Sequence, residues 1–106
     1  MDMRDEWLRG LRGWANGNGN VREVWLFGSR ATGCSRSGSD VDIAIALMPA
    51  TGGTDWALGS YFAFHSEWKR ELEGIVGRHV SLEIIISGTK EDAAVRSSGE
   101  LLWARN

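Results

Sequence analysis

The chain has few of the residues that mark secreted, zinc-binding or membrane-spanning proteins. It contains one cysteine, Cys34, in 106 residues, so no internal disulfide can form. No group of Cys and His has the spacing of zinc ligands. No apolar run approaches the roughly 18 residues that span a bilayer, and residues 1–14 lack the apolar core of a secretory signal. We therefore expect a soluble protein in a reducing, cytoplasmic setting.

Positive charge is also not in excess. The chain has 12 Lys and Arg against 14 Asp and Glu, and its net charge of -2 is spread along the sequence. Proteins whose main ligand is nucleic acid usually carry a basic patch, so we do not expect nucleic acid in that role. The length and the apolar fraction of 42% are those of one ordinary globular domain, residues 1–106.

The order of hydrophobic patterns predicts a small α/β (α+β) domain. Helical spacing predicts helices at 5–14 and 55–76 and a short one at 91–97. Segments rich in β-branched residues predict strands at 21–27, 40–47 and 80–87, with a short fourth strand at 101–103. The glycine- and serine-rich residues 28–39 read as a loop. We expect a mixed sheet of three to four strands packed with helices.

The aromatic content suggests two alternatives for the long helix. Six tryptophans are many for so short a chain, and large aromatic residues are favoured at interfaces. Phe64 lies four residues before Trp68 and widens the apolar face of this helix. That face either meets another chain, a partner or a second copy, or is a wide internal core face.

Two aspartates on one predicted strand are the first sign of chemistry. Asp40 and Asp42 are two residues apart, so their carboxylates share a face and lie about 6 to 7 Å apart. Like charges at this distance repel unless a cation lies between them. Mg²⁺ is usually held by one or two carboxylates together with substrate phosphates. The pair therefore predicts Mg²⁺ or Mn²⁺ and a phosphate ligand together.

A glycine-serine pair at the end of the preceding strand supplies a second element. Gly28 lets the backbone approach a ligand, and the hydroxyl of Ser29 can hold phosphate oxygens. Arg30 and Arg36 could add charged contacts. The spacing of Gly28 and Gly33 is that of a P-loop, but Cys34 stands where that motif needs its lysine, so a P-loop is excluded.

Taken together, LFGSRATGCSRSGSDVDIAI at residues 26–45 resembles the signature of the DNA polymerase β-like nucleotidyltransferase superfamily. The likeness is to its smallest members, the minimal nucleotidyltransferases, and it continues through GRHVSLEIII to SSGELLWAR. It implies the nucleotidyltransferase fold, with Gly28, Ser29 and Arg30 binding the nucleotide and Asp40 and Asp42 as catalytic metal ligands.

The superfamily also uses a third carboxylate on a neighbouring strand. Glu83 is the candidate for this catalytic and metal-binding position, because it alternates onto a polar face. Minimal members often have an aspartate at the position that reads here as Ser81, and on that alignment the third ligand is missing. Of the two histidines, we expect His65 to pack within the helix and His79 to be a turn residue.

The resemblance implies transfer of a nucleoside monophosphate, most simply AMP from ATP, to an acceptor hydroxyl. Minimal members often pair with a HEPN-domain toxin, and some act as antitoxins that modify a toxin tyrosine. The alternative is a non-catalytic nucleotide-binding antitoxin or partner-binding module, which Ser81 keeps open. A structural domain with a degenerate site ranks last, because it leaves the pair of Asp40 and Asp42 unexplained.

Overall fold

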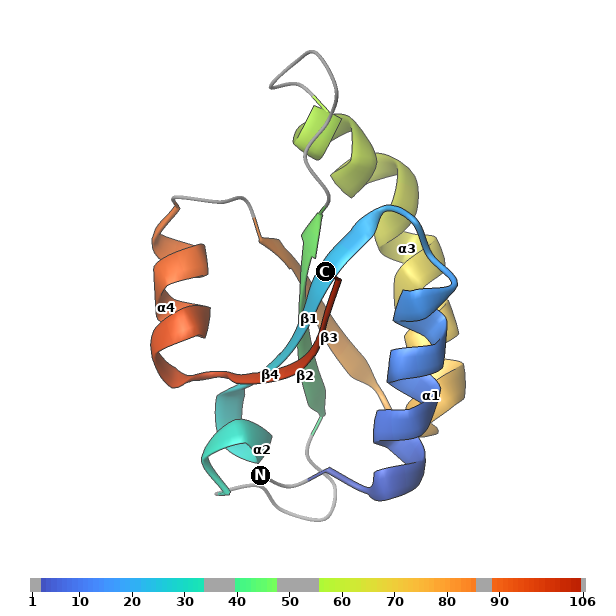
Figure 1. Ribbon diagram of the computed structural model, residues 1–106, viewed down its shortest axis with the longest axis vertical. Coiled ribbons are helices and arrows are strands. Elements are labelled where there is room, and N and C mark those ends of the chain that lie inside the picture. Colours follow the sequence, from blue (N-terminus) through green and yellow to red (C-terminus); the bar gives the residue numbers. More distant parts are fainter. Residues whose placement is uncertain (1–2, 34–39, 48–55, 86–88, 106) are drawn as a thin grey trace.

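A four-stranded sheet with helices on both faces forms the centre of the molecule (Figure 1). The computed structural model describes residues 3–33, 40–47, 56–85 and 89–105. The predicted fold class is confirmed. The elements in chain order are α1 (Asp5–Asn16), β1 (Val21–Phe27), α2 (Gly28–Thr32), β2 (Val41–Leu47), α3 (Trp56–Val76), β3 (Val80–Ile85), α4 (Lys90–Ser98) and β4 (Glu100–Ala104).

The sheet is mixed, with the strand order β3-β2-β1-β4. β1 pairs antiparallel with both β2 and β4, whereas β2 pairs parallel with β3. The end of β1 and the starts of β2 and β3 therefore meet at one end of the sheet. Two pairs in the register involve Asp42, which is opposite Phe27 of β1 and Ser81 of β3.

The main hydrophobic core lies between the sheet and the helices α1 and α3 (Figure 1). Trp68 of α3 is 3% exposed in this core. The ring of Trp14 meets it edge-on at 5.6 Å, and the ring of Phe64 stacks on it at 5.0 Å. Trp68 thus packs internally, against α1. Phe64, on which the interface alternative rested, is half-buried, so the contact of this face with another chain stays a prediction.

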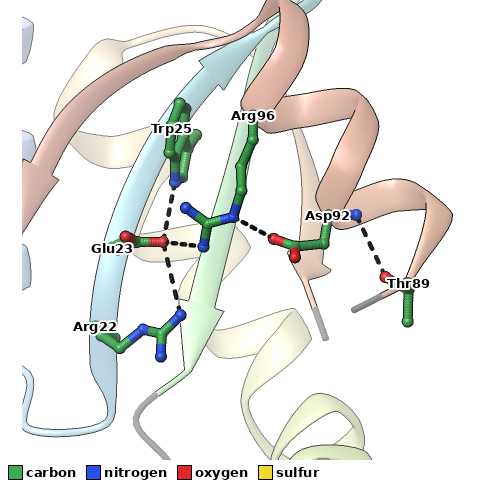
Figure 2. Close-up of polar contacts among 6 residues, drawn as sticks. All are labelled: Arg22, Glu23, Trp25, Thr89, Asp92 and Arg96. Carbon is green, nitrogen blue, oxygen red and sulfur yellow. Dashed lines mark hydrogen bonds and ion pairs between the residues drawn. The ribbon is translucent and has the colours of Figure 1, made fainter. Parts of the chain in front are cut away.

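The opposite face of the sheet carries a smaller core under α4, made by Trp25, Ala44, Ile85 and Val95. A polar cluster beside it ties α4 to β1 (Figure 2). Arg96 donates from Nε to Asp92 at 2.7 Å and from Nη2 to Glu23 at 2.6 Å. Its guanidinium also lies 5.4 Å from the centre of the Trp25 ring. Opposite charges and an aromatic face together hold α4 against the sheet.

The structure corrects the expectation of one long loop after β1. Residues 28–32 form the short helix α2, while residues 34–39, which include Cys34 and Arg36, lie outside the described part. The glycine- and serine-rich composition gave no local sign of a helix. Among the described residues, no helix is long and apolar enough to cross a membrane.

One arginine near the end of the chain joins β1 to the end of α1. Arg105 donates from Nε to the carbonyl of Val21 at 3.0 Å, and from Nη2 to the carbonyls of Ala15 and Asn18 at 3.0 and 2.9 Å. A single guanidinium thus satisfies carbonyls at the end of α1 and in the turn that follows it.

We predict that Arg105→Ala lowers the free energy of unfolding by about 2 kcal/mol, because hydrogen bonds from a charged donor contribute more than neutral ones. Urea unfolding followed by circular dichroism measures the change. Arg9→Ala, at an exposed position of α1, is the matched control and should shift the midpoint little. Equal midpoints for the two variants would contradict this role of Arg105.

Candidate active site

Asp40 and Asp42 lie at the start of β2, at the end of the sheet where β1 ends and β3 begins. Asp40 comes directly before the strand and its side chain is 53% exposed. Asp42 is half-buried within the strand, beside Phe27 of β1. The structure thus brings the two predicted carboxylates to one end of the sheet.

Gly28 is packed directly against the carboxylate of Asp42. Its φ of +71° is in the left-handed region that favours glycine. A Cβ at this position would also collide with Oδ2 of Asp42. The glycine is therefore required both by the turn from β1 into α2 and by the space that the carboxylate occupies. Ser29, the next predicted residue, is the second residue of α2.

The surroundings of Asp42 raise its pKa above the ordinary value. Burial is the largest cause and the nearby charge of Asp40 is the second, while Arg30 and a hydrogen bond with Ser81 act in the opposite direction. A carboxylate that is costly to ionise in the folded protein is a common feature of functional sites.

Arg30, a predicted nucleotide-binding residue, is 6% exposed. Its guanidinium lies 5.3 Å from the centre of the Trp7 ring, and Arg4 and Arg78 approach the same ring at 5.4 and 5.8 Å. Arg4, Trp7 and Arg78 also line an open hollow of roughly 550 Å³. Positive charge therefore gathers around Trp7, and through Arg30 it acts on Asp42.

The pairing of β2 with β3 separates the two candidates for the third carboxylate position. Ser81 is the direct neighbour of Asp42, whereas Glu83 is paired with Ala44 and is exposed. Successive residues on one face of a strand are about 6 to 7 Å apart, so Glu83 lies one step farther along the sheet. The structure does not place Glu83 beside the aspartates, and its role stays a prediction.

His79 is a residue whose position sequence reasoning missed. It precedes β3, as expected of a turn residue, but its Nε2 lies 4.0 Å from Oδ2 of Asp40 and its Nδ1 lies 3.0 Å from Oε2 of Glu73. Glu73 also accepts the backbone N–H of Val80 at 3.0 Å. His65 instead contacts the Leu82 carbonyl at 3.0 Å through Nε2 and is half-buried.

The family model described as polymerase beta, nucleotidyltransferase matches residues 11–106. The chain belongs to the polymerase beta nucleotidyltransferase family. The resemblance of residues 26–45 is thereby confirmed. No curated protein matches the chain in sequence.

Solved structures show the same fold at low identity. A toxin-antitoxin complex with AMP-PNP is 20% identical, with a TM-score of 0.65 over 96% of this chain and 73% of the other. The structure of the tri-AMPylated Shewanella oneidensis HEPN toxin in complex with MNT antitoxin is 17% identical, with a TM-score of 0.64 over 97% of this chain and 74% of the other. A candidate nucleotidyltransferase from Sulfolobus solfataricus is 21% identical, with a TM-score of 0.57 over 92% of this chain and 77% of the other.

Members of this nucleotidyltransferase family typically use divalent metals, and the two aspartates fit such an ion as a pair. Within the described ranges, no three His, Cys, Asp or Glu side chains stand close enough together to hold a metal. Mg²⁺ commonly takes only one or two carboxylates and completes its shell with water and substrate phosphates. Asp40 and Asp42 match that pattern, whereas a cage made entirely of protein ligands does not fit.

The raised pKa of Asp42 predicts that Asp42→Asn stabilises the folded protein near neutral pH. A pKa that is higher in the folded than in the unfolded state makes ionisation costly, so this contribution to stability is full at low pH and is lost as the pH rises through the folded value. Urea unfolding should give a higher midpoint for the variant near neutral pH and equal midpoints below about pH 3.

Asp92→Asn is a control for this measurement, because it should change stability in the opposite direction. Asp92 is 8% exposed and accepts from Arg96, so loss of its charge should lower stability near neutral pH. A lower midpoint for both variants would show that the charge of Asp42 stabilises the fold and would contradict the prediction.

Proposed function

We propose that this chain is a nucleotidyltransferase that transfers AMP from ATP to an acceptor hydroxyl. The observation that supports this most is the position of Asp42. The pKa of Asp42 is raised by burial and by the neighbouring charge of Asp40. Its carboxylate is packed against Gly28, which has a left-handed φ, and the chain belongs to the nucleotidyltransferase family. A purely structural role for these residues would not explain a carboxylate pair that repels itself.

In this proposal each group of residues has a distinct task. Asp40 and Asp42 hold Mg²⁺ or Mn²⁺, which supplies neutralising charge to the phosphates when it is bound. Gly28, Ser29 and Arg30 bind the triphosphate, and the arginines around the Trp7 ring add positive charge at this end of the molecule.

The reaction forms one bond and breaks one bond. The acceptor oxygen attacks the α-phosphorus of ATP in line, and the bond from this phosphorus to the bridging oxygen breaks, so that pyrophosphate leaves. The hydroxyl proton must pass to a base. Glu83 is proposed for this step, since it is exposed and lies on the same face as Asp42, two residues after Ser81.

A protein hydroxyl is the preferred acceptor. One solved structure of the same fold is an MNT antitoxin in complex with a tri-AMPylated HEPN toxin, and another is a toxin-antitoxin complex with AMP-PNP. By this likeness we propose a tyrosine of a HEPN-type toxin as the acceptor and an antitoxin role for the chain. In that role, modification of the toxin would neutralise it.

Ser81 favours a second candidate function, a non-catalytic antitoxin that binds nucleotide and inhibits its partner by contact. The neighbour of Asp42 on β3 is a hydroxyl and not a carboxylate. Two carboxylates are sufficient to bind a metal with nucleotide, but a weaker metal site would slow transfer. The two candidates therefore agree on nucleotide binding and differ on chemistry.

Isothermal titration of the protein with ATP tests the nucleotide site. We expect binding that needs Mg²⁺ or Mn²⁺ and that is lost in the Asp40→Asn, Asp42→Asn double variant, because both proposed metal ligands become neutral amides. Gly28→Ala should also abolish binding, since its Cβ would displace the carboxylate of Asp42. Metal-independent binding, or binding that survives in the double variant, would place the nucleotide elsewhere.

Transfer is tested with ATP labelled at the α-phosphate and a HEPN-type toxin as acceptor. Appearance of the label on toxin tyrosine, lost with Asp42→Asn, supports the transferase. A wild-type chain that binds the toxin and ATP but transfers no label supports the contact inhibitor instead. In that case Asp42→Asn should leave toxin binding unchanged.

A further inference from the structure

The pairing between β2 and β3 extends one step beyond the strands and places His79 beside Asp40. The N–H of Val41 donates to the carbonyl of His79 at 3.0 Å, which keeps the backbone of this segment against β2. Val41 and Val80 are register partners, and Asp40 and His79 are the residues that directly precede them. The two side chains, each more than half exposed, meet with Nε2 4.0 Å from Oδ2.

The other side of the imidazole ring is fixed by Glu73 at the end of α3. Nδ1 donates to Oε2 of Glu73 at 3.0 Å, and the same carboxylate oxygen is held by the N–H of Val80. The hydrogen bond from Val80 is the main reason why the pKa of Glu73 lies below its ordinary value. A neutral imidazole that donates from Nδ1 carries a lone pair on Nε2, and this lone pair can bind a metal ion.

Nε2 of His79 lies 4.0 Å from Oδ2 of Asp40, a distance that suits a cation shared by the two atoms. A hydrogen bond would bring the two atoms to about 2.7 to 3.2 Å. Two ligands that each lie about 2.1 Å from one ion are separated by about 3 to 4.2 Å, depending on their angle. Histidines that bind metals typically donate their second ring N–H to a carboxylate, as His79 does to Glu73.

We propose that His79 is a ligand of the divalent metal that Asp40 binds, with Nε2 as the donor atom. This inference rests on the proposed nucleotidyltransferase site and names a further residue in it. His79 and Asp40 are the pair that already lies together, whereas Asp42, in β2, forms no three-residue metal cluster with them in the described structure. The remaining positions around the ion are left to water and phosphate oxygens. Glu73 is a positioning residue that orients the ring.

A nitrogen ligand changes which metals the site favours. Imidazole suits transition metals better than Mg²⁺, which prefers oxygen ligands alone. A site with carboxylates and one imidazole should therefore bind Mn²⁺ more tightly than Mg²⁺, and this preference should depend on His79.

Electron paramagnetic resonance with Mn²⁺ alone tests the proposal directly. Protein without an affinity tag is required, so that His65 and His79 are its two histidines. Mn²⁺ bound to the wild type should show electron spin echo modulation from an imidazole ¹⁴N. In His79→Gln this modulation should vanish and the affinity for Mn²⁺ should fall by at least about tenfold.

The matched control is His65→Gln, because His65 contacts the carbonyl of Leu82 and not the aspartates. It should keep both the modulation and the affinity. Glu73→Gln should keep the modulation but weaken Mn²⁺ binding, because the ring loses its anionic partner. Circular dichroism of each variant checks that it is folded. If His79→Gln does not fold, the ¹⁴N modulation is compared between the wild type and His65→Gln, and its presence in both supports His79 as the ligand.

The outcomes separate this inference from the proposed function. Mn²⁺ binding that needs Asp40 and Asp42 but shows no ¹⁴N modulation overturns the role of His79 and leaves the nucleotide site intact. In that case the contact of His79 with Asp40 is an ion pair only. Absence of Mn²⁺ binding by the wild type also overturns the inference, and the titration with ATP then decides the proposed function separately.

Discussion

The parallel pairing of β2 with β3 determines which side chains can act together with the aspartates. Its register sets Ser81 beside Asp42 and Glu83 beside Ala44, and its continuation sets His79 beside Asp40. Strand alternation puts Asp42, Ser81 and Glu83 on the same face as Ala44 and Ile85, which lie under α4, while the other face is filled by the main core. A shift of one residue would turn the aspartates into that core, so the packing of Val41, Ile43 and Ile45 protects the site.

The site costs stability, and other parts of the fold provide it. The ionised carboxylate of Asp42 is partly desolvated and repelled by Asp40. Away from this end of the sheet, Arg96 joins α4 to β1 through Glu23 and is held within α4 by Asp92 (Figure 2). Arg105 joins the end of α1 to β1. These contacts are rich in charge-assisted hydrogen bonds, which are the stronger kind. The residues that destabilise the fold at the site and the contacts that stabilise it thus lie in different parts of the molecule, as is usual for functional sites.

Hydrophobic pattern alone was sufficient for the order of the four strands and of the helices α1, α3 and α4, because these depend on local periodicity, but it missed the short helix α2. It could not show which residue of β3 is paired with Asp42, Ser81 or Glu83, since alternation identifies a face of a strand and not the register between two strands. The partner of Trp68 was hidden for a similar reason, because helical spacing does not say what covers a face. His79 alternates with Ser81 and Glu83, so a signal was present, but its contact with Glu73 depends on how α3 meets β3.

Ser81 and His79 together suggest how this site can work with fewer carboxylates. A third carboxylate beside Asp42 would add a like charge and raise its pKa further. The hydroxyl of Ser81 acts in the opposite direction, because its hydrogen bond to Asp42 favours the ionised form. An imidazole at His79 would supply a metal ligand without a further negative charge. A neutral ligand and a hydrogen-bond donor would then replace one acidic group, which lowers the repulsion in the metal-free protein while the number of donor atoms is kept.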